Sequence, residues 1–448
     1  MLSPKLFILS ECENAKAALD QSLRHDFGSD RSKLYFDEVT LRLNAFRDRF
    51  SSVKEHEVGV LSTASSIISE LSTCLSLIER SHLGEFSWAF ADAFIELANP
   101  ICEEPKITEP GSIKPIFYIS SKGGLKAYQI VCESDLLLEF ANQRIFNIVF
   151  PHSLTHHVLL HAIIGHELCH AALVSDVSLA RIKTLFDTNV SLQTDTEATT
   201  WYRGIRTDCA LVFSGHLSRW KTEFLCDLFG LVLFGPAFLA ALKALLSGVD
   251  PTGLGDDLSQ RSHPPPLSRI QLLQQAAEIL DWSGAHRLTA IPKEAYIQLL
   301  ADLSGFSDGN PEKFQIITRN DLAITIDALK KYFETRSICS YKDLDETVIC
   351  QLYQDLDEGI PPSGSRFNEA LQIENIKVDF RLQLTAGWLW WAQRSHHENK
   401  EALTIPDYDS LKLVRNEFLF INKLCERGIL QRKAIRLALD NPNRKAVK

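Results

Sequence analysis

The sequence predicts a mostly helical α+β fold, and three observations support this. Apolar residues recur at helix spacing through residues 13–97. Short strand-like runs follow at residues 116–119, 128–132 and 145–150. Beyond Trp282 the helical spacing returns. Long helical regions around a few short strands are typical of the α+β class.

The composition excludes several classes of protein. The chain has 448 residues, of which 45% are hydrophobic, and this indicates two or three domains with large cores. The net charge is −10 and no basic stripe occurs, so we expect no nucleic-acid partner. The 10 cysteines are scattered without a C-x-x-C pair, which favours reduced thiols in a cytoplasmic protein.

No segment has the pattern of a signal peptide or a membrane span. Residues 1–20 contain only a short apolar patch at residues 6–9 before acidic residues appear. The longest apolar run, residues 228–242, is interrupted by Pro236 and ended by Lys243. This run is too short to cross a bilayer comfortably, and we expect a buried core helix with no membrane span.

The first predicted region, residues 1–110, is helical. A proline-rich connector is expected where it meets the strands, and Gly123-Gly124 is a candidate turn between the first two strands. The apolar stripe consists of Ile67, Ile68, Leu71, Cys74, Leu75 and Ile78, and the connector prolines are Pro100, Pro105, Pro110 and Pro115.

The last strand-like run leads into the sequence H-A-I-I-G-H-E-L-C-H-A at residues 161–171. His166, Glu167 and His170 form an H-E-x-x-H motif. On a helix the two histidines lie on one face and can reach a single metal ion. Zinc accepts two imidazoles and one further protein ligand, and it keeps a fourth position open for water. Glu167 lies about 100° round the helix from His166, where it could accept a proton from that water.

This motif also occurs by chance in long chains, and the region around it is rich in histidine. The neighbouring histidines are His152, His156, His157 and His161. Histidines on a helix are usually solvated or hydrogen-bonded within a core. The metal interpretation therefore depends on finding a third ligand.

Glu223 and Asp227 are candidates for that role. They are four residues apart, hence on one helix face, and their neighbours are apolar. Two carboxylates in a core helix are costly unless they are paired or bind a metal. The alternative is that both lie at a helix N-terminus, where acids interact favourably with the helix dipole.

His263 stands before three prolines, after a Gly/Asp/Ser-rich loop at residues 247–262. The prolines hold its backbone stiffly, and Arg269-Ile270 begin a further helix. The alternative for His263 is a histidine that only closes a proline turn.

The last predicted region, residues 283–448, is helical, with breaks near residues 305–311 and 359–364. Trp388, Trp390 and Trp391 could form a binding surface, but aromatic residues at helix spacing more often pack in a core.

Three separated motifs together resemble the gluzincin metallopeptidases, most closely the family of the CAAX prenyl endopeptidases and their soluble, stand-alone relatives. The motifs are His166-Glu167-x-x-His170, then Glu223-x-x-x-Asp227, then His263-Pro264 with Arg269-Ile270. The resemblance covers residues 111–282 and implies a zinc metallopeptidase domain there. That domain would have a zincin-like core, a short sheet with the active-site helices, between the two helical regions.

The resemblance implies a role for each site residue. His166, His170 and Glu223 would bind Zn²⁺, and Glu167 would be the general base. Asp227 would hydrogen-bond a ligand histidine. His263 would donate a hydrogen bond to the oxyanion of the transition state.

The resemblance also implies a zinc endopeptidase, a hydrolase that acts on a protein or peptide substrate. The membrane members of the family have several spanning helices, which this chain lacks, so prenylated membrane substrates are not expected. The helical flanks lie outside the resemblance and could bind a regulatory partner.

Three other interpretations were weighed. A metzincin would use Asp176 as third ligand, but it needs glycine where Leu173 stands and a methionine turn, and Met1 is the only methionine. A second alternative is a non-catalytic zincin-fold module that binds peptides or regulates a partner, although the intact Glu167 argues against it. A third is a regulated toxin or defence protease with the helical flanks as sensor.

Overall fold

The structure is a computed structural model, and the chain divides into two compact units. One unit comprises Met1–Ser87 and Ala98–Thr155, and the other comprises Trp88–Leu97 and His156–Lys448. These units divide the chain at positions other than the predicted boundaries after residues 110 and 282, and the three-region division stays a prediction. The structure describes residues 4–22, 30–53, 58–78, 87–105, 112–122, 128–132, 143–190, 209–246, 263–264, 266–282, 317–344, 347–364, 378–401 and 408–440.

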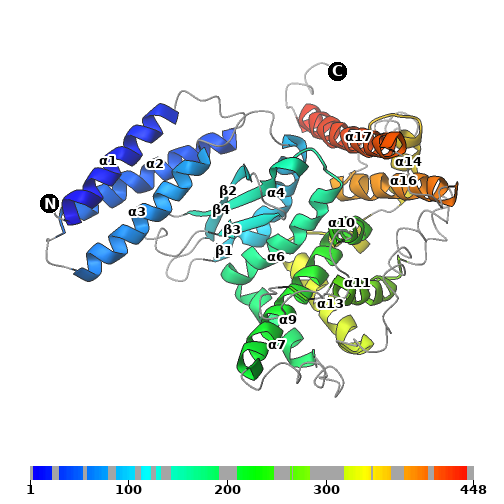
Figure 1. Cartoon of the computed structure of the whole chain (residues 1–448), viewed down its shortest axis with the longest axis horizontal. Helices are drawn as coiled ribbons and strands as arrows, with labels where there is room; N and C mark the ends of the chain where they lie inside the picture. The colour runs from blue at the N-terminus through cyan, green and yellow to red at the C-terminus, as the bar shows by residue number, and fades with distance from the viewer. Residues whose placement is uncertain are drawn as a thin grey trace. The chain divides into compact units, whose positions relative to one another are not determined.

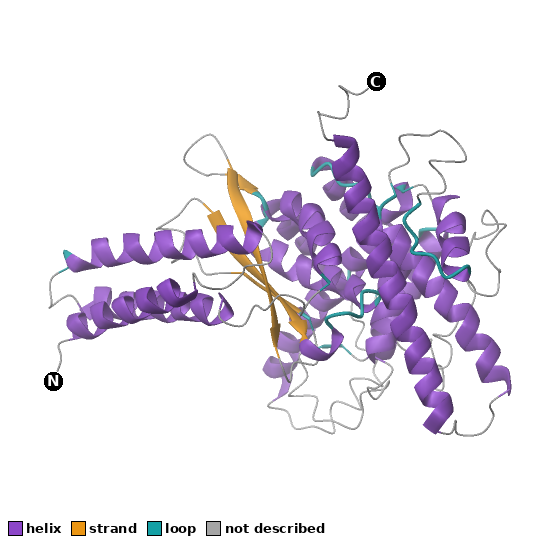
Figure 2. Ribbon diagram, turned by 90° about the horizontal axis from the view of Figure 1, so that it is seen from above, coloured by secondary structure: helices purple, strands orange, loops and turns teal. Residues whose placement is uncertain are grey.

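The first unit consists of three packed helices and a small mixed sheet (Figure 1). The strand order is β1-β2-β4-β3, with β2 and β4 parallel and the two outer pairs antiparallel (Figure 2). The helices are α1 (Pro4–Ser22), α2 (Asp30–Ser51) and α3 (Val58–Ile78). The strands are β1 (Glu104–Pro105), β2 (Ser112–Lys122), β3 (Gln129–Cys132) and β4 (Gln143–Pro151), and a short 3₁₀ turn, η1 (His152–Leu154), follows.

One face of this sheet packs on the helices. Tyr118 of β2 and Ile145 of β4 belong to the same buried cluster as the apolar faces of α1, α2 and α3. The ring of Tyr35, from α2, stacks on Tyr118 with centroids 4.1 Å apart. Burial of Tyr118 and Ile145, with Ile116 packed against them, thus joins the helices and the strands into one core.

The predicted strands are confirmed, but the proline-rich connector differs from the prediction. Pro100 lies inside α4 (Trp88–Cys102), Pro105 lies in β1 and Pro115 lies in β2. Pro115 is tolerated in a strand because β1 pairs with β2 only at Ser112 and Ile113. Pro110 and the candidate turn at Gly123-Gly124 lie outside the described residues.

The second unit is helical. It contains the first ten residues of α4. Because most described elements of the two units are helices and one unit contains the sheet, the predicted fold class, a mostly helical α+β protein, is confirmed. Its other elements are the 3₁₀ turns η2 (Leu160–Ile163) and η7 (Tyr341–Asp343) and the helices α6 (Ile164–Ser175), α7 (Val177–Asn189), α9 (Cys209–Phe234), α10 (Pro236–Leu246), α11 (Pro266–Ile279), α13 (Arg319–Thr335), α14 (Thr347–Asp357), α16 (Phe380–Glu401) and α17 (Tyr408–Asp440).

The long apolar run at residues 228–242 forms the end of α9 and most of α10, and its side chains are buried as predicted. The chain turns between the two helices at Gly235, whose φ of +66° favours glycine. Pro236 then occupies the first turn of α10, where its missing N–H leaves no helical bond unmade.

A pair of glycines lets α6 and α9 approach closely. A Cβ atom on Gly165 of α6 would lie 3.2 Å from the Cα atom of Gly230 on α9 and 2.8 Å from the ring of Phe234. This packing places one face of α6 directly against the middle of α9.

The tryptophan cluster lies in a core, as predicted. Trp388 and Trp390 of α16 are buried, and the indole N–H of Trp388 donates to the carbonyl oxygen of Leu159 at 2.9 Å. The predicted interruption of helical structure near residues 359–364 lies after α14, and Gly359 and Gly364 have positive φ values there. The other expected break, near residues 305–311, lies outside the described residues.

Among the helices of the described residues, none combines the length and the apolar character that crossing a bilayer requires.

Candidate metal centre

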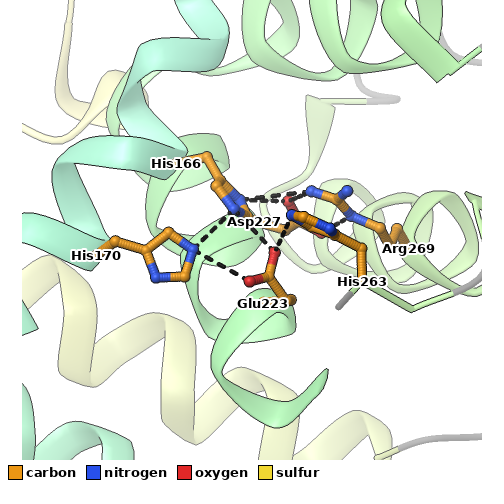
Figure 3. Close-up of polar contacts among 6 residues, drawn as sticks. All are labelled: His166, His170, Glu223, Asp227, His263 and Arg269. Carbon is orange, nitrogen blue, oxygen red and sulfur yellow. Dashed lines mark hydrogen bonds and ion pairs between the residues drawn. The ribbon is translucent and has the colours of Figure 1, made fainter. Parts of the chain in front are cut away.

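Three segments bring the predicted site residues together (Figure 3). His166 and His170 lie one turn apart on α6, with His166 buried and His170 about one-third exposed. Glu223 and Asp227 lie one turn apart on α9, which packs against α6. The third segment contributes His263 and, from α11, Arg269.

The alternative of a helix N-terminus does not apply to Glu223 and Asp227. Helix α9 begins at Cys209, so both carboxylates lie roughly four turns inside it. The relative exposure of Glu223 is 8% and that of Asp227 is 0%. Their charges must therefore be compensated by side chains rather than by the helix dipole.

The polar atoms of His166, His170 and Glu223 converge on one point. Nε2 of His166 lies 3.1 Å from Nε2 of His170 and 3.1 Å from Oε2 of Glu223. Nε2 of His170 lies 3.3 Å from Oε1 of Glu223. Nitrogen and oxygen ligands about 2.05 Å from a tetrahedral zinc ion are about 3.3 Å from one another. The separations in this site are close to that spacing, with a different oxygen of Glu223 facing each histidine, so the three residues are candidate ligands of a metal ion.

The tautomer of His166 supports the same conclusion. Its Nδ1 lies 2.8 Å from Oδ1 of Asp227, and a carboxylate can only accept, so Nδ1 carries the proton. In a neutral ring Nε2 then presents a lone pair toward His170 and Glu223. Lone pairs that face one another repel unless a proton or a cation lies between them, and a divalent cation satisfies all of them together.

Asp227 is held in turn by Arg269. Nε of Arg269 donates to Oδ2 and Nη2 donates to Oδ1 of Asp227, both at 2.7 Å, in a buried bidentate pair. Burial alone would raise the pKa of Asp227, but the charge and hydrogen bonds of Arg269 lower it. Arg269 belonged to the predicted motif, but the sequence did not predict this role for it.

Protons and charges in the metal-free cluster follow from these contacts. Burial lowers the pKa of His166, but the hydrogen bond and charge of Asp227 outweigh it and raise this pKa well above its ordinary value. Burial likewise lowers the pKa of His170, and hydrogen bonds with Cys226 and Glu223 raise it to about 10. Burial raises the pKa of Glu223, but hydrogen bonds from the two histidines lower it well below its usual range. In the absence of metal, the cluster therefore holds protons that a cation must displace.

The candidate general base Glu167 directly follows His166 on α6, and the charges of His166, His170 and Glu223 act on its carboxyl. Its side chain is partly buried on α6. Burial raises the pKa of its carboxyl, while the charges of His166 and His170 lower it by less. A raised pKa brings a carboxylate nearer to neutral pH, where a proton acceptor works best.

His263 lies in the site rather than only in a turn. Its Nε2 is 3.3 Å from Oε2 of Glu223, and its side chain is 57% exposed. Burial of the rest of the ring lowers the pKa of His263, which favours the neutral form. A neutral imidazole with one exposed edge can donate one N–H, either to Glu223 or to a bound molecule.

Sequence reasoning missed two cysteines beside the histidines. Cys226 has its sulfur within 4.8 Å of the ligand nitrogens of His166 and His170, so it is a second candidate for the third ligand. Cys169 forms a hydrogen bond with Cys226, and both are fully buried. The signal was present, because Cys226 lies three residues after Glu223 and Cys169 lies three residues after His166, on the same helix faces.

Glu223 and Cys226 are both candidates for the third ligand. The two oxygens of Glu223 lie 3.1 Å and 3.3 Å from the two histidine nitrogens, and the sulfur of Cys226 lies within 4.8 Å of them. Burial and the neighbouring Cys169 raise the pKa of the Cys226 thiol well above its ordinary value, so a metal would have to displace its proton.

The other histidines of the region lie elsewhere in the fold. The ring of His161 packs edge-on against Phe90, with centroids 4.8 Å apart. Nδ1 of His156 lies 3.7 Å from a carboxylate oxygen of Glu426. The histidine-rich composition therefore does not explain the convergence of His166 and His170.

Asp176, the third ligand in a metzincin, has other partners. Its side chain accepts hydrogen bonds from Tyr332 at 2.8 Å, from the backbone N–H of Ser178 at 2.7 Å and from Arg336. It caps the N-terminus of α7 and joins it to α13. These contacts support the rejection of the metzincin interpretation.

Comparisons of this chain with protein-family models, with curated proteins and with solved structures find no match.

Proposed function

We propose that this chain is a zinc-dependent endopeptidase that hydrolyses peptide bonds in a protein or peptide substrate. The observation that carries the proposal is the convergence of His166, His170 and Glu223, whose facing atoms are 3.1–3.3 Å apart. Glu167, which is not part of this ligand set, lies beside it. Two imidazoles, one carboxylate and an adjacent unliganded carboxylate are the donor set of a catalytic zinc site.

His166, His170 and Glu223 would hold the zinc ion. When bound, zinc would supply Lewis acidity, which polarises a scissile carbonyl and lowers the pKa of water to about 7. The resemblance to gluzincins and the packing of α6 against α9 support a zincin-like core around these residues.

Glu167 would accept a proton from the attacking water and deliver it to the nitrogen of the leaving amine. Burial raises the pKa of its carboxyl, and this shift favours both steps because it makes the carboxylate a better proton acceptor.

Asp227 and Arg269 would act on His166. Asp227 keeps the proton on Nδ1, so that Nε2 faces the ligand position, and Arg269 keeps Asp227 ionised. The exposed edge of His263 would donate a hydrogen bond to the oxygen that gains charge as the carbonyl is attacked.

The cellular location of the protein and its regulatory partner are part of the same proposal. We infer a cytoplasmic location from the scattered cysteines, which lack the spacing of a disulfide framework. We also infer that the helical flanks bind a regulatory partner.

The substitution Glu167→Gln tests the function. Glutamine keeps the size of the side chain but cannot accept a proton at neutral pH. We expect the variant to keep the wild-type zinc content, measured by elemental analysis, and to lose at least about 10²-fold in peptide turnover. The matched control is Glu278→Gln, an exposed glutamate of α11, which should leave turnover unchanged.

The alternative function, a zincin-fold module that binds without cleaving, predicts another result. Zinc-loaded wild type and Glu167→Gln would then capture the same partners, and all of those partners would remain intact. That result would exclude the peptidase. A peptidase instead leaves cleaved products with wild type and intact, trapped substrates with the variant.

A further inference from the structure

The long helix α17 has one buried face and one exposed face with a regular pattern. Its buried residues include Ile421, Leu424, Cys425 and Ile429. On the opposite side Phe420 is 49% exposed, Leu430 is 55% exposed and Leu437 is 58% exposed. In Figure 1 α17, in red, lies at the edge of its unit and packs on α16. Single exposed leucines are common on protein surfaces, whereas several exposed apolar side chains on one face of a helix can contribute to a helix–helix contact.

The exposed residues follow the heptad spacing of a coiled coil. We define the outer stripe as Phe420, Lys423, Arg427, Leu430, Ala434 and Leu437, all of which are exposed. Consecutive members are separated by three and four residues in strict alternation, and on a straight helix they lie within an arc of about 100°. This is the spacing of the contact positions in a pair of packed helices.

The charges on the outer stripe determine which arrangement of two identical helices is possible. In a parallel pair each residue meets its own copy, so Lys423 would face Lys423 and Arg427 would face Arg427. These like charges would repel one another at two neighbouring positions.

An antiparallel pair removes both repulsions. Reversing the stripe places Phe420 opposite Leu437, Lys423 opposite Ala434 and Arg427 opposite Leu430 of the second copy. Each cationic side chain then meets an apolar one, on which its methylene stem can pack while its charged end reaches water. The small Ala434 leaves room for the stem of Lys423. The stripe is therefore complementary to itself in one orientation only.

We propose that the outer stripe of α17 is a homodimer interface in which two copies of this chain pair their α17 helices antiparallel about a two-fold axis. A two-fold axis repeats each contact, so the three pairs described above occur twice. Six helical layers form a small contact, and we expect a reversible dimer with a dissociation constant in the range of about 1–100 μM. The proposal does not depend on the peptidase activity.

The test is sedimentation equilibrium of the full chain with a matched pair of substitutions at Ala434. Ala434→Glu places a carboxylate opposite Lys423 of the second copy and should tighten the dimer by about 2–10-fold. Ala434→Lys places a like charge there and should weaken it by a similar factor. Ala180, an exposed alanine on α7, provides the controls, and Ala180→Glu and Ala180→Lys should leave the equilibrium unchanged.

A charge exchange then tests the register. The double variant Lys423→Glu with Ala434→Lys restores an attractive pair at the same position, and it should recover the dimer that Ala434→Lys alone loses. Circular dichroism should show the same helix content in all variants, because these side chains are exposed. A wild-type monomer at concentrations up to about 100 μM would overturn the proposal. Equal effects of Ala434→Glu and Ala434→Lys, or no recovery in the double variant, would also overturn it.

Discussion

Nδ1 of His166 lies 2.8 Å from Oδ1 of Asp227, although the two residues are 61 positions apart in the chain. This contact fixes which nitrogen of His166 carries the proton, and it leaves Nε2 facing His170 and Glu223. Because Arg269 binds both oxygens of Asp227, the carboxylate keeps its charge in a fully buried position. A chain of contacts thus runs from a buried guanidinium to the candidate metal ligands.

The third ligand can be identified by zinc content. Glu223→Ala should lose most of the bound zinc, since it removes both oxygens that face the histidine nitrogens. With Glu223 as the ligand, Cys226→Ser should keep it, because the pKa of the buried Cys226 thiol lies well above its ordinary value and the thiol would have to lose its proton to bind. Zinc per chain is measured by elemental analysis after dialysis. Loss of zinc from Cys226→Ser, with Glu223→Ala unaffected, would assign the ligand to Cys226.

Asp176→Ala provides the control for that experiment. It should keep the zinc and lower the thermal stability, because the buried Tyr332 and the half-buried Arg336 lose their acceptor. If Asp176→Ala loses the metal from folded protein, the gluzincin assignment is wrong.

Asp227→Asn should weaken zinc affinity by roughly 10–100-fold without abolishing binding. Asparagine cannot carry the charge that fixes the His166 tautomer, and it leaves the buried Arg269 without a counter-ion. Competition with a chromogenic chelator measures the affinity. Denaturant unfolding of the metal-free variant should also show a loss of about 3–5 kcal/mol for the uncompensated charge. Unchanged zinc affinity would show that Asp227 does not orient His166 for metal binding.

His263→Ala should lower peptide turnover while leaving zinc content and unfolding free energy close to wild type. The reason is that the imidazole is 57% exposed and would act mainly on the developing charge of the substrate. Steady-state kinetics should show the loss in kcat rather than in KM. A parallel fall in folded yield and turnover would instead support the structural alternative, a histidine that closes the proline turn.

The stability of the metal-free protein should fall at high pH and also at low pH. The pKa of His170 is raised from 6.5 to about 10, so its contribution is complete below pH 6.5 and is lost as the pH rises through about 10. The pKa of Glu223 is lowered from 4.5, so its contribution is complete above pH 4.5 and is lost as the pH falls. Denaturant unfolding in the presence of a chelator, repeated across this pH range, measures both losses of stability. His170→Asn should reduce the loss of stability at high pH but not abolish it, because the pKa of His166 is raised as well. An unchanged loss would show that His170 does not contribute to it.

Gly165→Ala should destabilise the protein, because a methyl group there meets the buried ring of Phe234 at 2.8 Å and the Cα atom of Gly230 at 3.2 Å. Overpacking of this kind costs about 1–3 kcal/mol, which exceeds the roughly 1 kcal/mol that alanine gains over glycine in a helix. Thermal unfolding measures the net effect. Adding Phe234→Leu should recover part of the loss, and no recovery would mean that the two helices do not meet at this point.

The local patterns of the sequence predicted the elements correctly wherever one face of an element is buried. The apolar spacing located the helices around His166 and Glu223, and short runs of apolar residues located the strands at residues 116–119 and 145–150. These predictions succeed because helix and strand periodicity depends on residues within a few positions of one another. The candidate ligands His166, His170 and Glu223 were predicted for a similar reason, since their motif spacings reflect the geometry of single helices.

The tertiary structure alone decided which of these residues meet. The bidentate pair of Arg269 and Asp227 spans 42 positions, and the contact of His166 with Glu223 spans 57. No local pattern encodes such distances, because they depend on how closely α6 approaches α9, and this is set by Gly165 and Gly230. The position of Cys226 beside the histidines depends on the same packing. The sequence therefore determined the helices and the chemistry that each helix carries, whereas the long-range packing of α6 against α9 determined the site.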